Sequence, residues 1–200
     1  MSILVTPSSE AIAHLTKSEP LLGAAITTIG PIARKGEADI FTSLVRQIIG
    51  QQISTAAQRT VFQRLVDHVG TLSAEAIGSC AIAELQQLGM SYRKAEYIHD
   101  LSTQIVSGSY SLEPLYTLSD EEAIDHLCTI RGVGRWTAEM LLIFTLERAD
   151  VVSFLDLGIR RGMQRLYGLA EINRETFASY RTRYSPHGTA ASLYLWEIAR

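Results

Sequence analysis

Apolar residues recur at helical spacing along most of the chain, and this pattern predicts a series of helices. In the stretch "DIFTSLVRQIIG" the apolar positions lie three or four residues apart, at Phe41, Leu44, Val45, Ile48 and Ile49. The pattern resumes in residues 56–66, and Gly50 with the polar pair 51–52 interrupts it. We therefore expect two helices joined by a polar junction.

Residues that start and stop helices divide the rest of the chain into similar segments. Ser73 is placed to begin a helix, and Gly89 to end one. An amphipathic helix is predicted from about Ser91 to Val106. In "SDEEAIDHLCTI", Ser119 and Glu122 have the spacing of a capping box. With no alternating strand pattern, we expect an all-α fold class with nine to eleven helices, and one domain spanning residues 1–200.

Two glycines separate the capped helix from a strongly apolar one. In "CTIRGVGRWTAEM" they are Gly132 and Gly134, and "RWTAEMLLIFTLE" is apolar around most of its circumference, which predicts a central buried helix. Glycines allow close backbone approach, and the first amides of the following helix form a site suited to phosphate. A glycine turn between helices is also common for structural reasons alone, so the pattern by itself leaves both readings open.

Composition and charge limit the class of protein. The chain has 200 residues and two cysteines, Cys80 and Cys128, with no CxxC pair, so neither a disulfide framework nor a metal cluster is indicated. No apolar run approaches membrane-spanning length, and no signal peptide is recognisable, which predicts an intracellular protein. The net charge is −3, but residues 129–200 hold ten arginines against seven acidic residues. A polyanion would therefore be met by the C-terminal part.

One carboxylate lies in an apolar stretch. In "VVSFLDLGIRRG", Asp156 stands among Phe154, Leu155 and Leu157. A carboxylate in such company is costly unless it is paired or used in chemistry. Asp156 is equally well placed to cap a helix beginning near Leu157, and the two roles are compatible.

Four ordered motifs together resemble a known family. "IIGQQIS", "GMSYRKAEYI", "LCTIRGVGRWTAEMLLIF" and "FLDLGIRRG" resemble the helix-hairpin-helix DNA glycosylases, specifically the alkylation-repair branch (3-methyladenine DNA glycosylase II). The resemblance spans about residues 38–200. It implies a two-lobed helical bundle with a cleft between the lobes and the helix-hairpin-helix motif at about residues 120–147.

The resemblance also assigns roles to residues. It implies that Asp156 is the catalytic carboxylate and that Gln52 wedges into the stack that a flipped base vacates. Where members that also cut the strand carry a lysine nucleophile, this chain has Trp136, which implies base release without strand cleavage. The resemblance implies that Gly132, Val133 and Gly134 form the hairpin that binds the phosphate backbone. The candidates for the base pocket are Trp136, Met140, Ser54 and Tyr92.

The implied function is excision of alkylated purines, of the 3-methyladenine and 7-methylguanine type, which leaves an abasic site. The partner is double-stranded DNA with alkylated bases or abasic sites. We expect a monomer with no membrane contact, in the cytoplasm or nucleoid of a bacterium or the nucleus of a eukaryote. No cofactor is expected, although in relatives a monovalent cation can be held at the hairpin by carbonyls corresponding to those of Cys128, Ile130 and Gly132.

Two departures from the family pattern leave an alternative open. Met140 stands where relatives can carry a second pocket aromatic, and His187 with Gly188 where they often have an aromatic residue and an arginine. The alternative is a catalytically weak homologue that binds abasic or damaged DNA. A helical interaction domain with no DNA role is a third reading, which the four ordered motifs disfavour.

Overall fold

A computed structural model describes residues 2–200, which form two compact units. Unit 1 comprises residues 37–141, and unit 2 comprises residues 2–36 and 142–200. The chain passes from unit 1 to unit 2 within helix α9 (Arg135–Phe144). No helix in residues 2–200 is long and apolar enough to cross a membrane.

The described residues are mostly helical, as expected, but they contain more elements than the sequence predicted. There are twelve α-helices and one 3-10 helix in residues 2–200, compared with the nine to eleven expected. The structure also contains a two-stranded sheet, which corrects the expectation that strands are absent. Its strands are β1 (Ser2–Val5) and β2 (Arg34–Glu37). The sequence of β2, "RKGE", has no apolar alternation, which is why the pattern did not reveal it.

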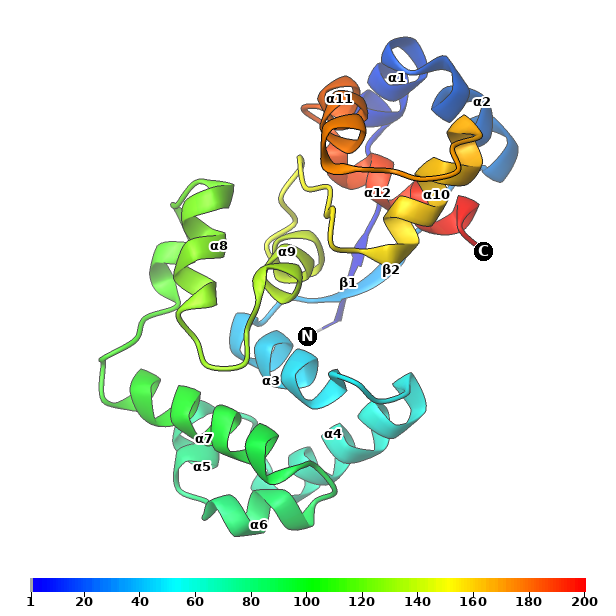
Figure 1. The fold of residues 1–200 in the computed structure, drawn as a ribbon. Coiled ribbons are helices and arrows are strands. Elements are labelled where there is room, and N and C mark those ends of the chain that lie inside the picture. Colours follow the sequence, from blue (N-terminus) through cyan, green and yellow to red (C-terminus); the bar gives the residue numbers. More distant parts are fainter. Residues whose placement is uncertain (1) are drawn as a thin grey trace. The chain divides into compact units, whose positions relative to one another are not determined.

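Four helices of unit 1 begin at serine N-caps, of which Ser73 and Ser119 were predicted as helix starts from the sequence. Ser54, Ser73, Ser91 and Ser119 each accept a hydrogen bond from a backbone N–H in the first turn of their helix. Helix α7 packs against α3, α5 and α6 (Figure 1). The helices are α3 (Ile40–Gly50), α4 (Thr55–Val69), α5 (Ala74–Gly78), α6 (Ile82–Gln87), α7 (Tyr92–Val106), the 3-10 helix η1 (Glu113–Tyr116) and α8 (Asp120–Cys128).

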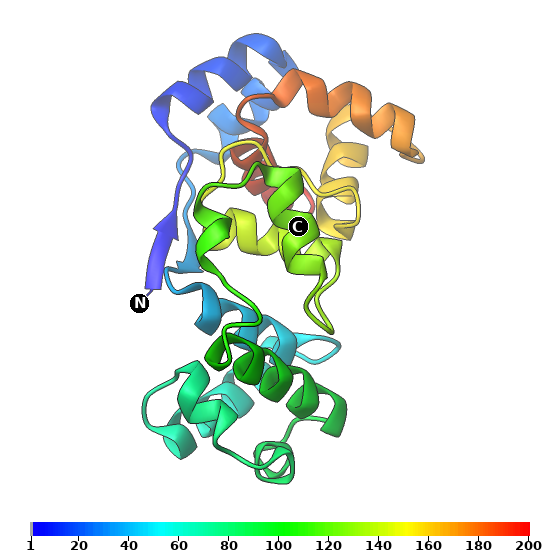
Figure 2. The same cartoon turned by 90° about the vertical axis from the view of Figure 1, so that its left-hand side faces the viewer.

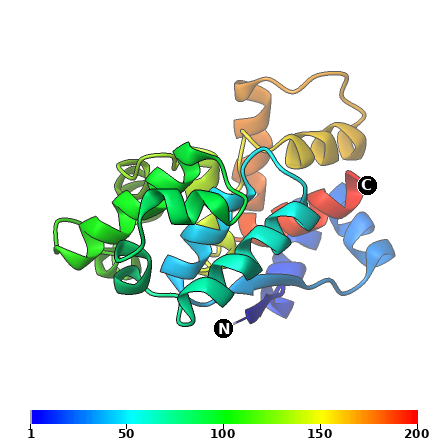
Figure 3. The same ribbon diagram turned by 90° about the horizontal axis from the view of Figure 1, so that it is seen from below.

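The predicted polar junction lies between α3 and α4. Figure 3 shows this loop, in cyan, connecting the two helices. All five apolar residues that defined α3 in the sequence are buried, as the helical spacing predicted. Helix α9 is confirmed as a buried helix, because its residues 137–143 are all buried.

Unit 2 is organised around its last helix, α12 (Gly188–Ile198), in which residues 188–195 are all buried. The blue helices α1 and α2 lie beside the red α12 in two views (Figures 1 and 2). Helix α10 packs closely on α12 because Gly162 lacks a side chain: a Cβ there would lie 2.1 Å from the carbonyl oxygen of Leu195. The other helices are α1 (Ser9–Ser18), α2 (Pro20–Ile29), α10 (Leu157–Tyr167) and α11 (Arg174–Tyr184).

Candidate functional site

The carboxylate of Asp156 lies at the start of α10 and is held by two donors. Its Oδ1 accepts a hydrogen bond from the backbone N–H of Ile159 at 2.8 Å, so the predicted helix cap is confirmed. The same oxygen accepts a second hydrogen bond from the indole Nε1 of Trp196 at 2.9 Å. Asp156 is buried, whereas Leu155 and Leu157 on either side of it are exposed. The carboxylate therefore has a fixed orientation within unit 2.

Trp196 was not among the residues that the sequence singled out. It lies on α12, forty residues after Asp156, and its ring stacks on Phe144 with the centroids 5.6 Å apart. Gly158 makes room for it, because a Cβ at this position would lie 2.7 Å from Cδ1 of the indole. The glycine two residues after the aspartate is thus a sequence signal for a close neighbour, but it does not identify which residue that neighbour is.

The two hairpin glycines have different surroundings in unit 1. Gly132 has φ +85°, and a Cβ there would lie 2.2 Å from the ring of Tyr97, so only glycine fits. Gly134 is exposed, and a Cβ there would meet no atom within 4 Å. Val133 between them is buried and anchors the turn. The N-terminus of α9 follows directly, and a helix N-terminus is a suitable place for an anion.

The arginines beside the hairpin are already paired with carboxylates. Arg131 forms ion pairs with Asp100 and Glu96. Arg135 forms ion pairs with Glu121 at 2.6 Å and with Glu139 at 3.1 Å. The number of arginines in this stretch therefore overstates its capacity to hold a polyanion, and backbone amides are the better candidates for binding a phosphate here.

Gln52 lies in the exposed loop between α3 and α4 and has an unusual backbone conformation. Its φ is +57°, one of two positive values among the non-glycine residues described, the other being Glu147. A left-handed conformation in a residue with a side chain costs about 1–2 kcal/mol, so the surrounding structure must maintain it. Such a conformation at an exposed loop tip is consistent with a functional role for Gln52.

The four base-pocket candidates differ in their accessibility. Trp136 is 43% exposed at the start of α9, so it is not a core tryptophan. Tyr92 is 53% exposed in the first turn of α7, and Ser54 is an exposed N-cap whose hydroxyl accepts from the N–H of Ala57. Met140 is buried. Of these four candidates, Trp136 and Tyr92 present large accessible ring surfaces.

Comparison with protein-family models relates most of the chain to a known family. The family model described as "HhH-GPD superfamily base excision DNA repair protein" matches residues 45–184, which is more than half of the chain. The chain belongs to the HhH-GPD superfamily.

Similar proteins extend this relationship over almost the whole chain. The DNA-3-methyladenine glycosylase 1 of Schizosaccharomyces pombe is 30% identical over 205 residues, which cover 98% of this chain and 90% of the relative. A crystal structure of a DNA-3-methyladenine glycosidase from Bacillus halodurans has a TM-score of 0.88 and 31% identity, covering 98% of this chain and 92% of that one. The structure of the Schizosaccharomyces pombe 3-methyladenine DNA glycosylase in complex with abasic DNA has a TM-score of 0.81 and 29% identity. The match covers 94% of this chain and 96% of that one.

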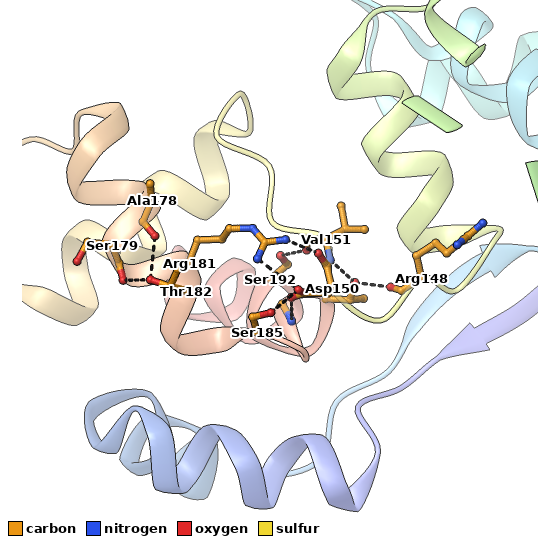
Figure 4. Close-up of polar contacts among 11 residues, drawn as sticks. Arg148, Asp150, Val151, Ala178, Ser179, Arg181, Thr182, Ser185 and Ser192 are labelled. Atoms are coloured by element: carbon orange, nitrogen blue, oxygen red, sulfur yellow. Dashed lines mark hydrogen bonds and ion pairs between the residues drawn. The ribbon is translucent and has the colours of Figure 1, made fainter. Parts of the chain in front are cut away.

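The departure from the family pattern at residues 187–188 has a local cause in this HhH-GPD protein. The Asp150 carboxylate accepts hydrogen bonds from Ser185 Oγ at 2.6 Å and from the Gly188 N–H at 2.9 Å, and it pairs with Arg181 (Figure 4). A Cβ at residue 188 would lie 2.6 Å from Asp150 Oδ1. An arginine at this position would not fit without a change around Asp150. Gly188, the first residue of α12, is therefore closely packed against Asp150.

Two of the three carbonyl groups expected to hold a cation accept hydrogen bonds within the protein. The oxygen of Ile130 accepts from the N–H of Val133 at 3.0 Å, and that of Gly132 accepts from Gln51 Nε2 at 2.8 Å. A carbonyl oxygen has two lone pairs, so one hydrogen bond does not by itself prevent a further contact. Cys128 lies at the end of α8, immediately before the hairpin.

One group of chemically active side chains was not predicted. Ligand atoms of His68, Cys80 and Glu84 lie within 4.8 Å of one another on α4 and around the start of α6. Two of them have structural roles already: the Cys80 thiol donates to the Ala76 carbonyl, and the Glu84 carboxylate accepts from the Ala81 N–H in a capping interaction. Their wide spacing in the sequence explains why no ligand pattern was visible.

Proposed function

We propose that this protein is a monofunctional DNA glycosylase that excises alkylated purines, of the 3-methyladenine and 7-methylguanine type, during base excision repair. The observation that carries the proposal is the buried Asp156 carboxylate, which Ile159 and Trp196 hold in place in a member of the HhH-GPD superfamily. Its partner is double-stranded DNA with alkylated bases or abasic sites. It acts as a monomer where DNA is found, in the cytoplasm or nucleoid of a bacterium or the nucleus of a eukaryote.

The first step is extrusion of the damaged nucleotide, because its glycosidic bond cannot be reached inside the duplex. Extrusion costs a few kcal/mol. Gln52 fills the space that the base leaves. The amides that follow Gly132 and Gly134 bind a backbone phosphate at the N-terminal end of α9. A monovalent cation held by the carbonyls of Cys128, Ile130 and Gly132 would add positive charge beside that phosphate.

The second step is recognition of the extruded base. N-alkylated purines are cationic, and an aromatic face attracts a cation by about 0.5–2 kcal/mol. The exposed ring of Trp136 supplies such a face, with Tyr92 and Ser54 as further contacts, while Met140 supports the helix from inside. A cationic base is also a good leaving group, so the reaction does not require a strong general acid.

The third step is cleavage of the bond between the base and C1′ of the deoxyribose. The bonding electron pair leaves with the base, which becomes neutral, and positive charge develops on the sugar. The ionised Asp156 carboxylate stabilises that charge, and a water molecule then adds at C1′ and releases its proton. Trp136 cannot form a Schiff base as a lysine would, so the product is an abasic site in an intact strand.

The test is a single-turnover assay with duplexes that carry 3-methyladenine, 7-methylguanine, ethenoadenine or hypoxanthine, followed by alkaline cleavage. Wild-type protein should release a cationic base and give strand breaks only after alkali. Asp156→Asn keeps an oxygen that accepts from Ile159 and Trp196, so the fold should persist, while the rate falls by about 10²–10³-fold. Affinity for abasic DNA should be unchanged.

Two outcomes would contradict this mechanism. If Asp156→Asn matched wild type in base release, Asp156 would be a helix cap without a catalytic role. If the wild type bound abasic DNA tightly and released none of the four bases, the protein would be a damage-binding homologue, the function that the departures at residues 187–188 and Met140 left open.

A further inference from the structure

Most of the loop that carries Gln52 is exposed to solvent. Residues 51–53 border a cavity of about 230 Å³, whose other walls include residues 89–91 and Lys94. Gln52 and Ile53 are exposed. A loop beside a cavity can shift unless polar contacts fix it, and the positive φ of Gln52 shows that something maintains a costly conformation there.

Lys94 supplies one such contact from the neighbouring helix. Lys94 lies in the first turn of α7, and its Nζ donates to the carbonyl oxygen of Ile49 at 2.8 Å and to that of Gln51. The Ile49 carbonyl is in the last turn of α3, where carbonyl groups lack partners within the helix and the helix dipole favours a positive charge. Burial lowers the pKa of the Lys94 ammonium, so this charge is placed here at some cost.

Gln51 supplies a second contact, which reaches the phosphate-binding hairpin. Its Nε2 donates to the carbonyl oxygen of Gly132 at 2.8 Å, across 81 positions of sequence. Gly132 itself packs on the ring of Tyr97, which follows Lys94 by three residues on α7. Helix α7 therefore contacts the Gln52 loop through Lys94 and the hairpin through Tyr97, and Gln51 joins the loop to the hairpin directly.

We propose that Lys94 and Gln51 are positioning residues that hold the Gln52 loop at a fixed place relative to the hairpin before DNA binds. The proposal rests on the proposed function, because it explains how phosphate binding at the hairpin is converted into extrusion of a base. A loop that is already ordered loses little conformational entropy when Gln52 enters the stack. Without the two contacts, that ordering would be added to the cost of extrusion.

The experiment compares two substrates within each variant, so that differences in the active fraction cancel. The substrates are duplexes with 7-methylguanine opposite cytosine, where extrusion is costly, and opposite a mismatched adenine, where it is cheaper. Lys94→Met should lower the single-turnover rate about tenfold on the paired substrate and about twofold on the mismatched one. Gln51→Leu should likewise lower the rate on the paired substrate more than the rate on the mismatched one.

Two further variants separate positioning from general destabilisation. Lys94→Arg keeps a charged donor, so the ratio of its rates on the paired and mismatched substrates should be close to that of the wild type. Lys17→Met removes the same charge from the exposed surface of α1 and should leave this ratio unchanged. Combining Lys94→Met with Gln52→Ala should add little to the loss from Gln52→Ala alone, because Lys94 acts through that residue. Equal losses on both substrates, or fully additive effects, would overturn the proposal.

A binding measurement decides the question even if the wild type releases no base. The ratio of affinities for abasic and undamaged duplexes reports how well Gln52 fills a vacant position in the stack. Lys94→Met should lower this ratio by about fivefold, an estimate of about 1 kcal/mol. An unchanged ratio would overturn the role of Lys94, whereas absence of base release in the wild type would count against the proposed function alone.

Discussion

The indole of Trp196 donates a hydrogen bond to the carboxylate of Asp156, with Nε1 and Oδ1 2.9 Å apart. A carboxylate that only capped a helix would need no donor from another helix. Here α12 adds one, and the ring of Phe144 stacks on the same indole. The charge that is proposed to act on the sugar therefore has a defined direction before any substrate binds.

Replacing Trp196 with phenylalanine separates this hydrogen bond from the packing of the ring. Trp196→Phe keeps an aromatic ring against Phe144 and removes the N–H. Hydrogen bonds to charged groups contribute about 1.5–3 kcal/mol, so the free energy of unfolding should fall by about that amount. Base release should fall about tenfold, because the carboxylate loses its orientation.

Chemical denaturation and single-turnover kinetics on the same preparations measure both effects. In the double variant with Asp156→Asn, the loss in rate should be no greater than for Asp156→Asn alone. Independent, additive losses in rate would show that Trp196 does not act through Asp156.

The hairpin offers a matched pair of substitutions at Gly134. A Cβ at this position meets no atom within 4 Å, so Gly134→Ala should bind DNA as the wild type does. Gly134→Asp places a negative charge beside the phosphate that we propose to bind here, and affinity for any duplex should fall about tenfold. Fluorescence anisotropy at about 50 and about 200 mM salt tests this, since phosphate contacts also make affinity fall with salt. Equal affinities of the aspartate and alanine variants would contradict phosphate binding at the hairpin.

Trp136 should affect the choice of base more than DNA binding. Because its ring is 43% exposed, Trp136→Ala should change the free energy of unfolding by less than about 1 kcal/mol. Release of cationic 7-methylguanine should fall by about 2–30-fold, the loss expected for a cation–π contact, while release of neutral hypoxanthine falls less. Trp136→Phe keeps an aromatic ring, so its rate of 7-methylguanine release should lie between those of the wild type and Trp136→Ala. A uniform loss for both bases would mean that Trp136 does not recognise charge.

The sequence predicted those features that depend on neighbouring residues. The caps at Ser73 and Ser119, the helix after Asp156 and the buried face of α3 were all encoded within a few positions, and the structure confirms them. Local rules were less reliable where a helix meets a loop. Residues 56–57 and 60 continue the apolar pattern of the sequence, yet they are exposed in the first turns of α4.

Contacts between distant segments could not be predicted in this way. The partner of Asp156 lies forty residues away, and the partner of Gln51 eighty-one residues away. A lysine in an amphipathic helix, such as Lys94, looks like any solvated charge until the carbonyls it meets are known. The strand β2 depends on a close approach as well, because a Cβ at Gly36 would lie 2.2 Å from the carbonyl oxygen of Phe144.

The positive φ of Gln52 gives the last prediction, in which stability and activity change in opposite directions. Glycine adopts this conformation without steric cost, so Gln52→Gly should remove a strain of about 1–2 kcal/mol and lose about 0.5–1 kcal/mol to the greater freedom of the unfolded chain. The free energy of unfolding should therefore stay equal or rise by up to about 1.5 kcal/mol.

Base release should nevertheless fall, most of all from fully paired duplexes, because no side chain remains to fill the stack. Glu147→Gly is the matched control: Glu147 is exposed with φ +49°, lies in unit 2 and has no proposed contact with DNA. It should show the same change in stability with unchanged base release. Thermal unfolding and single-turnover rates for the two variants give the comparison, and a Gln52→Gly protein that released bases at the wild-type rate would exclude a role for this side chain in extrusion.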